Sequence, residues 1–497
     1  MASTCGVTNL FDSPRWAASD LGRPIPDSPH AVSAALPRWA DVVGYEEREP
    51  RVIEAMAGGY PRFVCHRACQ RLFADLAAKA AHDLGAARRA RAFDSPQAAQ
   101  RFAGFLRRRG DASATVLEDQ RFAAHYDPRF EDSARAFWQH TGEGISSRAA
   151  EAWLNGEPMP DAPRAKAALR RRIADLAGVD AGDVWLASTG MAAMFTLRRA
   201  LARLYPDRPS VQFGFPYVDT LKVLQTFGGE TVFHPRGDDA ELDALERSTA
   251  HRPPAGIYTE LPSNPLLRSP DLERLAAMTR RSEAPLIIDD TLATWLNVDL
   301  AGVADATWSS LTKYFSGVGD VTGGCLVIRP ESPQAARLRE AVEAEWVDGL
   351  CGADAELLER NSRDFVERMP GFNANAAALA DHLADHPAVG AVHYPGHRDD
   401  PGYRRARRAQ GGYGGLLSFE MRQPTLAPAV YDRLRVNKGP NLGANYTLAC
   451  PFTLLAHYDE LDWAESCGVS RWLIRVSVGL EPISDLKDRF DEALAPS

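Results

Sequence analysis

The sequence has little of several features that mark particular classes of protein. Its 497 residues include only 7 cysteines, at positions 5, 65, 69, 325, 351, 450 and 467, and they form no CxxC pair. Few, scattered cysteines exclude a disulfide scaffold and suit a reducing compartment. No apolar run approaches the roughly 20 residues that span a bilayer. The N-terminus "MASTCGVTNLFDSPRW" lacks the basic segment and apolar core of a signal peptide. We therefore expect a cytoplasmic protein with no membrane partner.

Positive charge is also scarce. The chain has 57 Lys and Arg against 66 Asp and Glu, a formal net charge of -9. Such a chain is not built to neutralise phosphate backbones, so we expect no nucleic-acid partner. The run "YRRARRAQGG" is rich in arginine but has no interleaved aromatic residues, which favours a solvated helix.

Metal-ligand patterns are incomplete. Cys65, His66 and Cys69 have helical spacing, but no second ligand pair follows at the distance of a zinc site. A second group of histidines is interrupted by prolines, which favours surface positions: His382, His386, His393 and His397. We expect no metal.

The length and the residue pattern indicate several domains. A chain of 497 residues exceeds one compact core. Residues 1–55 are rich in proline and turn formers, so we expect an arm that wraps another part of the chain, and helical spacing follows. We predict an arm and helical segment at 1–150, a large α/β domain at 151–365 and a C-terminal α+β domain at 366–497.

Within the predicted α/β domain, short apolar runs alternate with amphipathic stretches. The expected strands are "DVWLAS", "SVQFGF", "ETVFHP", "AGIYTEL", "PLIIDD", "ATWSSL" and "GGCLVIR". This alternation is typical of a mostly parallel sheet covered by helices. Beyond about residue 371 the pattern changes to a helix, the strands "GGLLSFEM" and "WLIRVSVG", and a terminal helix "SDLKDRFDEAL".

Four segments end an expected strand with residues unsuited to a core. They are "LASTGMAAMF", "IIDDTLATW", "TELPSNPLL" and "SSLTKYFSG". Each has an ordinary explanation by itself, such as a turn or a helix cap. Lys313 alone is equally a solvated surface charge, a phosphate clamp or a Schiff-base nucleophile. Together the segments offer a Gly-containing anion site, an acid, a fixed amide and a lysine at one sheet edge. Pyridoxal phosphate (PLP) requires that set.

The amino-acid sequences of these segments also resemble those of a known family. "ELPSNPLL", "DDT", "SLTKYFSG" and "LACPFTLLAHY" are similar to motifs of the Cys/Met-metabolism PLP enzymes, which include cystathionine γ-synthase, cystathionine γ-lyase and methionine γ-lyase. The fungal type of cystathionine γ-synthase is the most similar, over about residues 59–494. The resemblance implies PLP fold type I, the aspartate-aminotransferase-like fold, with a large and a smaller domain.

The resemblance also implies roles for individual residues. Lys313 would bond to the cofactor and act with Tyr217 in catalysis, Asp289 would face the pyridine nitrogen, and Asn264 would lie near the ring oxygen. Tyr217 would also stack on the ring. The implied phosphate cradle consists of Thr189, Gly190, Met191, Ser310 and Thr312.

Three further positions concern the substrate and the assembly. Tyr60 and Arg62 match a motif that reaches the phosphate of a neighbouring subunit, which implies a homodimer or homotetramer with shared active sites. Arg475 matches the arginine that grips the α-carboxylate of an amino-acid substrate, a task suited to a bidentate guanidinium.

Three positions depart from the family pattern and bear on substrate choice. In "NLGANYTL", Asn441 stands where the family often has serine, and Tyr446 where it has glutamate. Asp219, in "YVDT", replaces a small residue and is expected to face the substrate side chain.

The expected function is γ-replacement or γ-elimination on an amino acid with a leaving group at Cγ, such as an activated homoserine. Two alternatives stay open. One is a specialised γ-lyase for a non-standard amino acid, for example a γ-halogenated one that yields an alkyne. The other is a non-catalytic binding or regulatory protein on the same fold.

Overall fold

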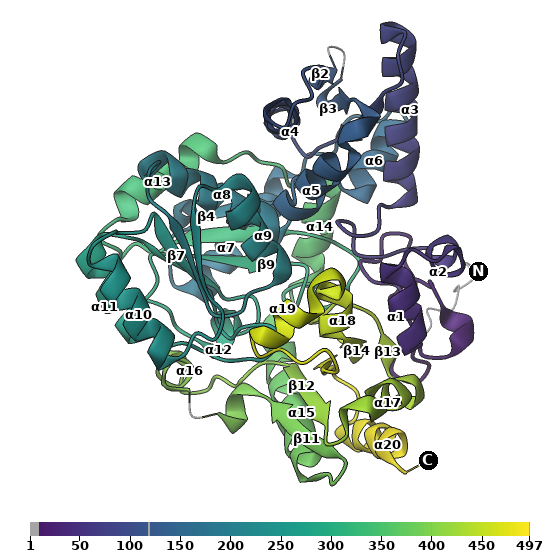
Figure 1. Cartoon of the computed structure of the whole chain (residues 1–497), viewed down its shortest axis with the longest axis vertical. Coiled ribbons are helices and arrows are strands. Elements are labelled where there is room, and N and C mark those ends of the chain that lie inside the picture. The colour runs from purple at the N-terminus through teal and green to yellow at the C-terminus, as the bar shows by residue number, and fades with distance from the viewer. Residues whose placement is uncertain (1–8, 118–119, 399, 497) are drawn as a thin grey trace.

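A computed structural model describes residues 9–117, 120–398 and 400–496 (Figure 1). In these ranges the chain forms three sheets that occupy successive parts of the sequence. The first eight residues of the predicted arm, with Cys5, lie outside the described residues. The domain boundaries given above stay a prediction.

The N-terminal part packs helices around a small antiparallel sheet of order β1-β3-β2. Its elements are α1 (Trp39–Glu46), α2 (Pro50–Ala55), α3 (Arg67–Leu84), β1 (Arg89–Ala92), α4 (Pro96–Arg108), β2 (Thr115–Leu117), β3 (Gln120–Tyr126), α5 (Glu131–Thr141) and α6 (Ser147–Leu154). The sheet corrects the sequence prediction, which placed only helices after the arm. The strand β1 reads "RARA", and its buried alanines give a weak strand pattern.

The arm that precedes α1 lies against the C-terminal domain. The Lys438 amide donates to the Arg15 carbonyl over 3.1 Å, and the Leu36 amide donates to the Lys438 carbonyl over 3.0 Å. The Val32 amide donates to the Gly319 carbonyl over 2.9 Å, just beyond the lysine segment. Backbone hydrogen bonds thus hold the arm in place.

The central sheet has the order β4-β10-β9-β8-β7-β5-β6. Its strands are β4 (Val184–Ala187), β5 (Ser210–Phe213), β6 (Thr231–His234), β7 (Gly256–Glu260), β8 (Leu286–Asp289), β9 (Ala306–Ser310) and β10 (Gly324–Ile328). The strands from β9 to β6 are parallel, and β10 is antiparallel to both neighbours. All the strands predicted for this domain are present, and the α/β prediction is confirmed.

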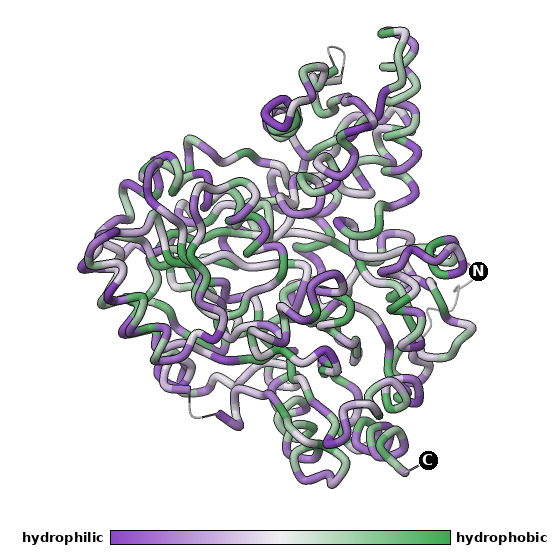
Figure 2. The backbone as a smooth tube through the Cα atoms, in the orientation of Figure 1, coloured by the Kyte–Doolittle hydropathy of each residue, from purple (hydrophilic) through white to green (hydrophobic). Residues whose placement is uncertain are grey.

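Helices cover both faces of this sheet. They are α7 (Pro163–Ala177), α8 (Gly190–Leu204), α9 (Val218–Phe227), α10 (Asp239–Thr249), α11 (Leu272–Ser282), α12 (Thr294–Asn297), α13 (Ala335–Glu345) and α14 (Gly352–Asn361). Successive residues of β4 point to opposite faces of the sheet: Leu186 packs with residues of α7, and Trp185 packs with residues of α8. Strands buried on both faces read as continuous apolar runs. Figure 2 shows hydrophobic colour concentrated in the centre and hydrophilic colour along the outer helices.

The C-terminal domain has a second sheet, of order β11-β12-β15-β14-β13, and antiparallel except for β13 with β14. Its elements are α15 (Phe365–Asp385), β11 (Val389–His393), α16 (Pro401–Ala406), β12 (Leu416–Met421), α17 (Ala427–Arg433), β13 (Asn437–Lys438), β14 (Leu448–Pro451), α18 (Phe452–Ala456), α19 (Leu461–Ser466), β15 (Ile474–Ser477) and α20 (Ile483–Leu494). Of the helices in the described ranges, none combines the length and the hydropathy needed to cross a membrane.

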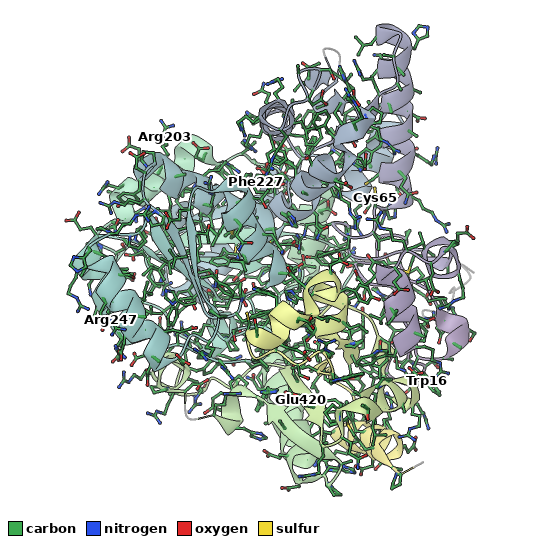
Figure 3. All side chains as sticks on the ribbon, viewed as in Figure 1. Trp16, Cys65, Arg203, Phe227, Arg247 and Glu420 are labelled. Carbon is green, nitrogen blue, oxygen red and sulfur yellow. The ribbon has the colours of Figure 1, made fainter. Side chains whose placement is uncertain are left out.

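Aromatic packing joins the N-terminal part to the central domain. Phe227, at the end of α9, is labelled where the two meet in Figure 3. Its ring centroid lies 5.0 Å from that of Phe105 and 5.5 Å from that of Phe137. Such edge and tilted contacts add to the apolar area that each ring buries. The N-terminal part is therefore fixed against the sheet.

Gly324 of β10 packs closely against the start of α8, and a mutation can test how tight this packing is. A Cβ added at Gly324 would lie 2.2 Å from the Thr189 carbonyl oxygen and 2.5 Å from the Gly190 nitrogen. We expect Gly324→Ala to lower the free energy of unfolding by about 1–3 kcal/mol, because the turn before α8 must move. Denaturant titration checks this. Gly182→Ala is the control, since nothing lies within 4 Å of its added Cβ; equal stability of the two variants would contradict the prediction.

Candidate active site

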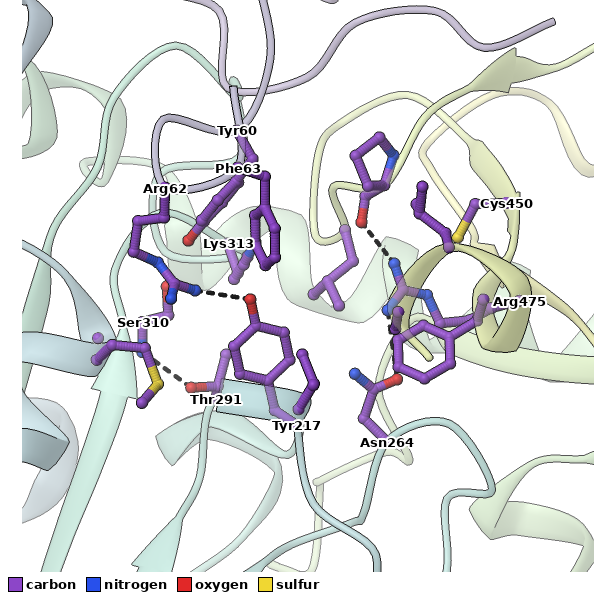
Figure 4. A pocket seen from close by; sticks show the side chains of 18 of the residues that line it. Tyr60, Arg62, Phe63, Tyr217, Asn264, Thr291, Ser310, Lys313, Cys450 and Arg475 are labelled. Carbon is purple, nitrogen blue, oxygen red and sulfur yellow. Dashed lines mark hydrogen bonds between the residues drawn. The ribbon is translucent and has the colours of Figure 1, made fainter. Parts of the chain in front are cut away.

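A cavity of about 150 Å³ lies where the carboxyl edge of the central sheet meets the C-terminal sheet and the N-terminal segment. Register brings the strand ends together, since Glu260 pairs with Asp289 and Asp289 with Trp308. Ligands of open α/β sheets bind at such an edge. The residues of the sequence prediction that line the cavity are Tyr60, Arg62, Gly190, Met191, Tyr217, Asn264, Asp289, Ser310, Lys313 and Arg475. Figure 4 labels these members of the set: Tyr60, Arg62, Tyr217, Asn264, Ser310, Lys313 and Arg475.

Lys313 faces this cavity rather than the solvent. Its Nζ donates to Asn441 Oδ1 over 2.7 Å and lies 4.5 Å from the ring centroid of Tyr60. Burial lowers the pKa of Lys313 well below its ordinary value, and the charges of Arg475 and Arg62 lower it further. A neutral amine is nucleophilic and accepts protons. Of the three roles considered for Lys313, the structure therefore excludes the solvated surface charge.

Two acids of neighbouring strands, Glu260 and Asp289, line the same cavity as the lysine. Asp289 accepts a hydrogen bond from the Thr291 amide over 2.9 Å, and burial raises its pKa to about 6. Burial and the charge of Asp289 raise the pKa of Glu260 well above its usual range. A cationic ring nitrogen would stabilise the ionised form of Asp289. Asp290 lies on the other face of the strand, as alternation requires, and accepts a hydrogen bond from Ser309.

Another part of the cavity wall has the properties of an anion site. Gly190 begins α8, whose N-terminus presents free amides. A Cβ at Gly190 would lie 2.9 Å from the Cβ of Ser310, so only glycine leaves this space open. Among the described residues, the buried Ser310 hydroxyl has no hydrogen-bond partner. A phosphate between Gly190 and Ser310 would supply that partner.

Two members of the implied phosphate cradle, Thr189 and Thr312, use their hydroxyls in hydrogen bonds within the protein. The Thr189 hydroxyl caps α8 by accepting from the Ala192 amide over 3.0 Å, and it donates to the Gly142 carbonyl. The Thr312 hydroxyl accepts from the Gly323 amide over 3.1 Å. Neither residue lines the cavity. Their predicted contact with the phosphate stays a prediction.

Arg62 is held inside the cavity of its own chain. It donates to the Tyr217 hydroxyl over 2.6 Å and to the carboxylate of Asp219. His140 Nδ1 lies 2.7 Å from the other Asp219 oxygen. Burial alone would raise the pKa of Asp219, but Arg62 and His140 together lower it to about 2.

These contacts correct one expectation. Asp219 is fully buried behind Arg62 and does not line the cavity, because its carboxylate pairs with the guanidinium. Tyr60 and Arg62 line the cavity of their own chain.

Arg475 lies across the cavity from Arg62 (Figure 4). It donates to the Pro440 carbonyl over 2.6 Å and to Asn264 Oδ1 over 3.3 Å. Its guanidinium carbon lies 4.8 Å from the ring centroid of Phe452. A fixed, buried guanidinium of this kind is suited to a carboxylate.

The two departures from the family pattern in "NLGANYTL", Asn441 and Tyr446, lie at different distances from the cavity: only Asn441 contacts Lys313. Asn441 accepts the hydrogen bond from Lys313, so it orients the lysine. Tyr446 does not line the cavity; its hydroxyl donates to the Val318 carbonyl over 3.1 Å, and its ring packs with Leu10 and Ile25 of the arm. The structure corrects its assignment as a substrate contact.

Potential metal ligands outside the cavity are already engaged. In the described part of the chain, His30, His66 and Glu151 form a group within 4.8 Å. His66 Nε2 lies 2.6 Å from the Pro29 carbonyl oxygen, and its Nδ1 accepts from the Ala68 amide. His66 therefore acts as a helix cap.

Comparison with known families agrees with this geometry. Residues 162–495 match the family of Cys/Met metabolism PLP-dependent enzymes, and residues 68–146 match the N-terminal domain of fungal trans-sulfuration enzymes. The chain belongs to the Cys/Met metabolism PLP-dependent enzymes. The predictions of the family, the fold, an enzymatic activity and a PLP cofactor are confirmed.

Relatives align over nearly the whole chain. Cystathionine gamma-synthase of Neurospora crassa is 34% identical over 96% of this chain and 98% of its own. The L-2-amino-4-chloropent-4-enoate dechlorinase/desaturase of Streptantibioticus cattleyicolor is 36% identical over 95% of this chain and 97% of its own. The crystal structure of cystathionine gamma synthase from Xanthomonas oryzae pv. oryzae, in complex with aminoacrylate and cysteine, has a TM-score of 0.58 and 27% identity. It covers 66% of this chain and 85% of that chain.

The cavity of this family member fits PLP. The unpartnered Ser310 hydroxyl and the space at Gly190 suit its phosphate, the acid pair suits its ring nitrogen, and the amine of Lys313, whose pKa is lowered, suits its aldehyde. The residue-by-residue roles stay predictions, to be tested by mutation.

Sequence reasoning missed several residues of the site. Glu260 ends a buried strand as Asp289 does, a pattern that would have identified it. Thr291 follows the two aspartates, and its hydroxyl accepts from the Ser310 amide over 2.8 Å. His140 has no local indication, since only the fold brings α5 to Asp219. The same holds for the arm residues that line the cavity: Ala34, Leu36, Tyr45, Glu46 and Met56.

The buried pair of Asp219 and Arg62 gives a prediction for stability. The native pKa of Asp219, about 2, lies below the ordinary carboxyl value of about 3.9, so its stabilisation is present above pH 4 and is lost as pH falls toward 2. We expect Asp219→Asn to cost about 3–5 kcal/mol at neutral pH, because Arg62 loses its buried partner. The cost should shrink on acidification. Urea titrations at several pH values measure both effects.

Asp462→Asn serves as the control, because it removes a carboxylate paired with Arg471 on the surface, where its side chain is 96% exposed. Exposed pairs contribute about 0–1 kcal/mol. If both variants lost the same free energy of unfolding, the buried pair of Asp219 and Arg62 would not stabilise the fold more than a surface ion pair does.

Proposed function

We propose that this chain catalyses γ-replacement or γ-elimination on a small amino acid that carries a leaving group at Cγ. The observation that carries the proposal is a lysine with a lowered pKa, held in one cavity with a buried arginine suited to a carboxylate. The names of the relatives support the reaction class, since one is a synthase and the other a dechlorinase/desaturase.

The chain's residues divide the work between binding and proton transfer. PLP, when bound, withdraws electrons from Cα of the amino acid and so makes its proton removable. Arg475 would hold the α-carboxylate and fix Cα near Lys313. Lys313 Nζ, oriented by Asn441 and with a lowered pKa, would take the Cα proton, release it to water, and only then take a Cβ proton, which allows the Cγ substituent to leave.

Tyr217 is a donor rather than a base in this arrangement. Burial raises its pKa well above the ordinary value, although Arg62 opposes that shift. Its hydroxyl therefore stays protonated at neutral pH. Held by Arg62, it would donate a hydrogen bond to a group that gains negative charge, such as the leaving group.

Replacement on an activated homoserine, with formation of cystathionine, is the first candidate. It is favoured by the 34% identity to a cystathionine gamma-synthase over almost the full length of both chains. A specialised γ-lyase for a halogenated unsaturated amino acid is the second candidate, favoured by the 36% identity to the dechlorinase/desaturase.

Hydrogen exchange tests the reaction class. We expect holoenzyme incubated with O-acyl-homoserine in deuterated water, with and without cysteine, to introduce deuterium at both Cα and Cβ, because γ-chemistry removes both protons. Mass spectrometry and NMR locate the label. Borohydride reduction should attach the cofactor to Lys313, and Lys313→Ala should lower exchange by at least about a hundredfold. Exchange confined to Cα with every substrate tried would refute γ-chemistry.

The assembly and the location keep their sequence-based predictions, a homodimer or homotetramer in the cytoplasm. Arg62 pairs with Tyr217 and Asp219 of its own chain. These contacts support active sites that are each built by one chain rather than shared between subunits. We propose an oligomer in which each chain supplies its own Tyr60 and Arg62.

Mixing two inactive variants distinguishes active sites built by one chain from active sites shared between subunits. If each site is built by one chain, Lys313→Ala and Arg62→Ala chains refolded or co-expressed together should show no more activity than the separate variants, since no hybrid site holds both residues. Activity assays at several mixing ratios check this. Recovery of about a quarter or more of wild-type activity would mean that subunits exchange the segment with Arg62.

A further inference from the structure

We propose that the N-terminal arm forms a subsite for the far end of the bound amino acid, and that Glu46 in this subsite binds an ammonium group. The inference rests on the proposed function, because it concerns a ligand whose α-carboxylate is held by Arg475. It assigns a role to a segment in which the sequence indicated no chemistry.

The arm supplies one wall of the cavity that contains Lys313. Ala34 and Leu36 line it from the extended part of the arm, Tyr45 and Glu46 from the last turn of α1, and Met56 from the residue after α2. A single cavity therefore runs from the catalytic lysine to the end of α1.

The short helix α18 connects the two ends of this cavity. Phe452, at its start, lies under the guanidinium of Arg475. Leu455, one turn later, shares an apolar cluster with Tyr45 and Met56. Both α18 residues line the cavity. A ligand anchored at Arg475 whose side chain follows the apolar face of α18 would reach the end of α1.

Glu46 is an acid without a partner at that position. Among the described residues it makes no hydrogen bond and no ion pair, whereas the adjacent Glu47 accepts a hydrogen bond from Tyr458. The side chain of Glu46 is half-buried, and a partly desolvated carboxylate is stabilised when a ligand brings a hydrogen-bond donor. Burial and the charge of Asp459 raise the pKa of Glu46 to about 8, while Arg48 opposes them.

The surroundings of Glu46 favour a cation over other donors. The rings of Tyr45 and Phe63 line the same cavity, and aromatic faces attract ammonium groups. An approaching ammonium would stabilise the ionised carboxylate, whereas a ligand carboxylate would be repelled. The ligand class is thus an amino acid whose side chain ends in an amine, such as the thioether formed when an aminothiol replaces the Cγ leaving group.

Calorimetric titration of the holoenzyme with three thioethers of homocysteine tests this. Their side chains end in an aminoethyl, a propyl or a carboxyethyl group on sulfur, so they differ mainly in terminal charge. We expect the aminoethyl ligand to bind at least about tenfold more tightly than the propyl ligand, and the carboxyethyl ligand to bind most weakly, because a hydrogen bond to a charged group is worth roughly that factor.

Glu46→Gln keeps the size of the side chain and removes the charge. It should abolish most of the preference for the aminoethyl ligand and leave binding of the propyl ligand unchanged. Glu47→Gln, next to it and outside the cavity, should keep the wild-type preference. Equal binding of the aminoethyl and propyl ligands by the wild type, or an unchanged preference in Glu46→Gln, would overturn the inference.

Exchange at Cα and Cβ with O-acyl-homoserine, measured in the same preparations, separates this inference from the proposed function. Double exchange without an ammonium preference rejects only the role of Glu46. Absence of double exchange in the wild type rejects the reaction class, whatever the binding ranking.

Discussion

Two buried guanidinium groups flank the amine of Lys313, and much of the molecule holds them there. Arg62 is neutralised by Asp219 and bonded to Tyr217, while Arg475 is held by the Pro440 carbonyl and Asn264. Burial and their charges together lower the pKa of the lysine. Because an uncompensated buried charge is costly, each arginine requires its own set of acceptors. Those acceptors come from separate parts of the chain, so the site forms only when all of these parts pack together.

The same constraint explains how the site is divided among the layers. The central sheet contributes acids and small residues at strand ends, where alternation sends Asp289 into the cavity and Asp290 behind it. The C-terminal sheet contributes Arg475, and the N-terminal segment contributes Tyr60 and Arg62. Rigid strands place the cofactor residues, whereas loops and the arm close the cavity around the substrate. Binding residues on loops over a rigid scaffold are a common division of this kind.

The departures from the family pattern acquire physical meaning in this arrangement. Asp219 pairs with Arg62, so an acid at a position usually occupied by a small residue serves to retain a cation. Tyr446 fills space between the arm and the lysine loop. The proposed subsite places substrate selection at the wall formed by the arm instead of at these positions. A subsite with an unpartnered acid there distinguishes ligands by terminal charge, a larger effect than small differences in apolar contact.

The sequence by itself determined the α/β and α+β architecture, the family and the cofactor. The short, regular apolar runs were sufficient for the architecture, and the lysine, the acid and the amide after the strands indicated the cofactor. The family came from the resemblance of the motifs around these residues. It did not determine the small N-terminal sheet, because the alanine-rich β1 has a weak strand pattern. Only the tertiary structure decided that Asp219 faces Arg62, that His140 joins them, and that Glu46 reaches the cavity of Lys313. These contacts join residues far apart in the chain, and the identity of a charged side chain gives no indication of which distant charge it meets.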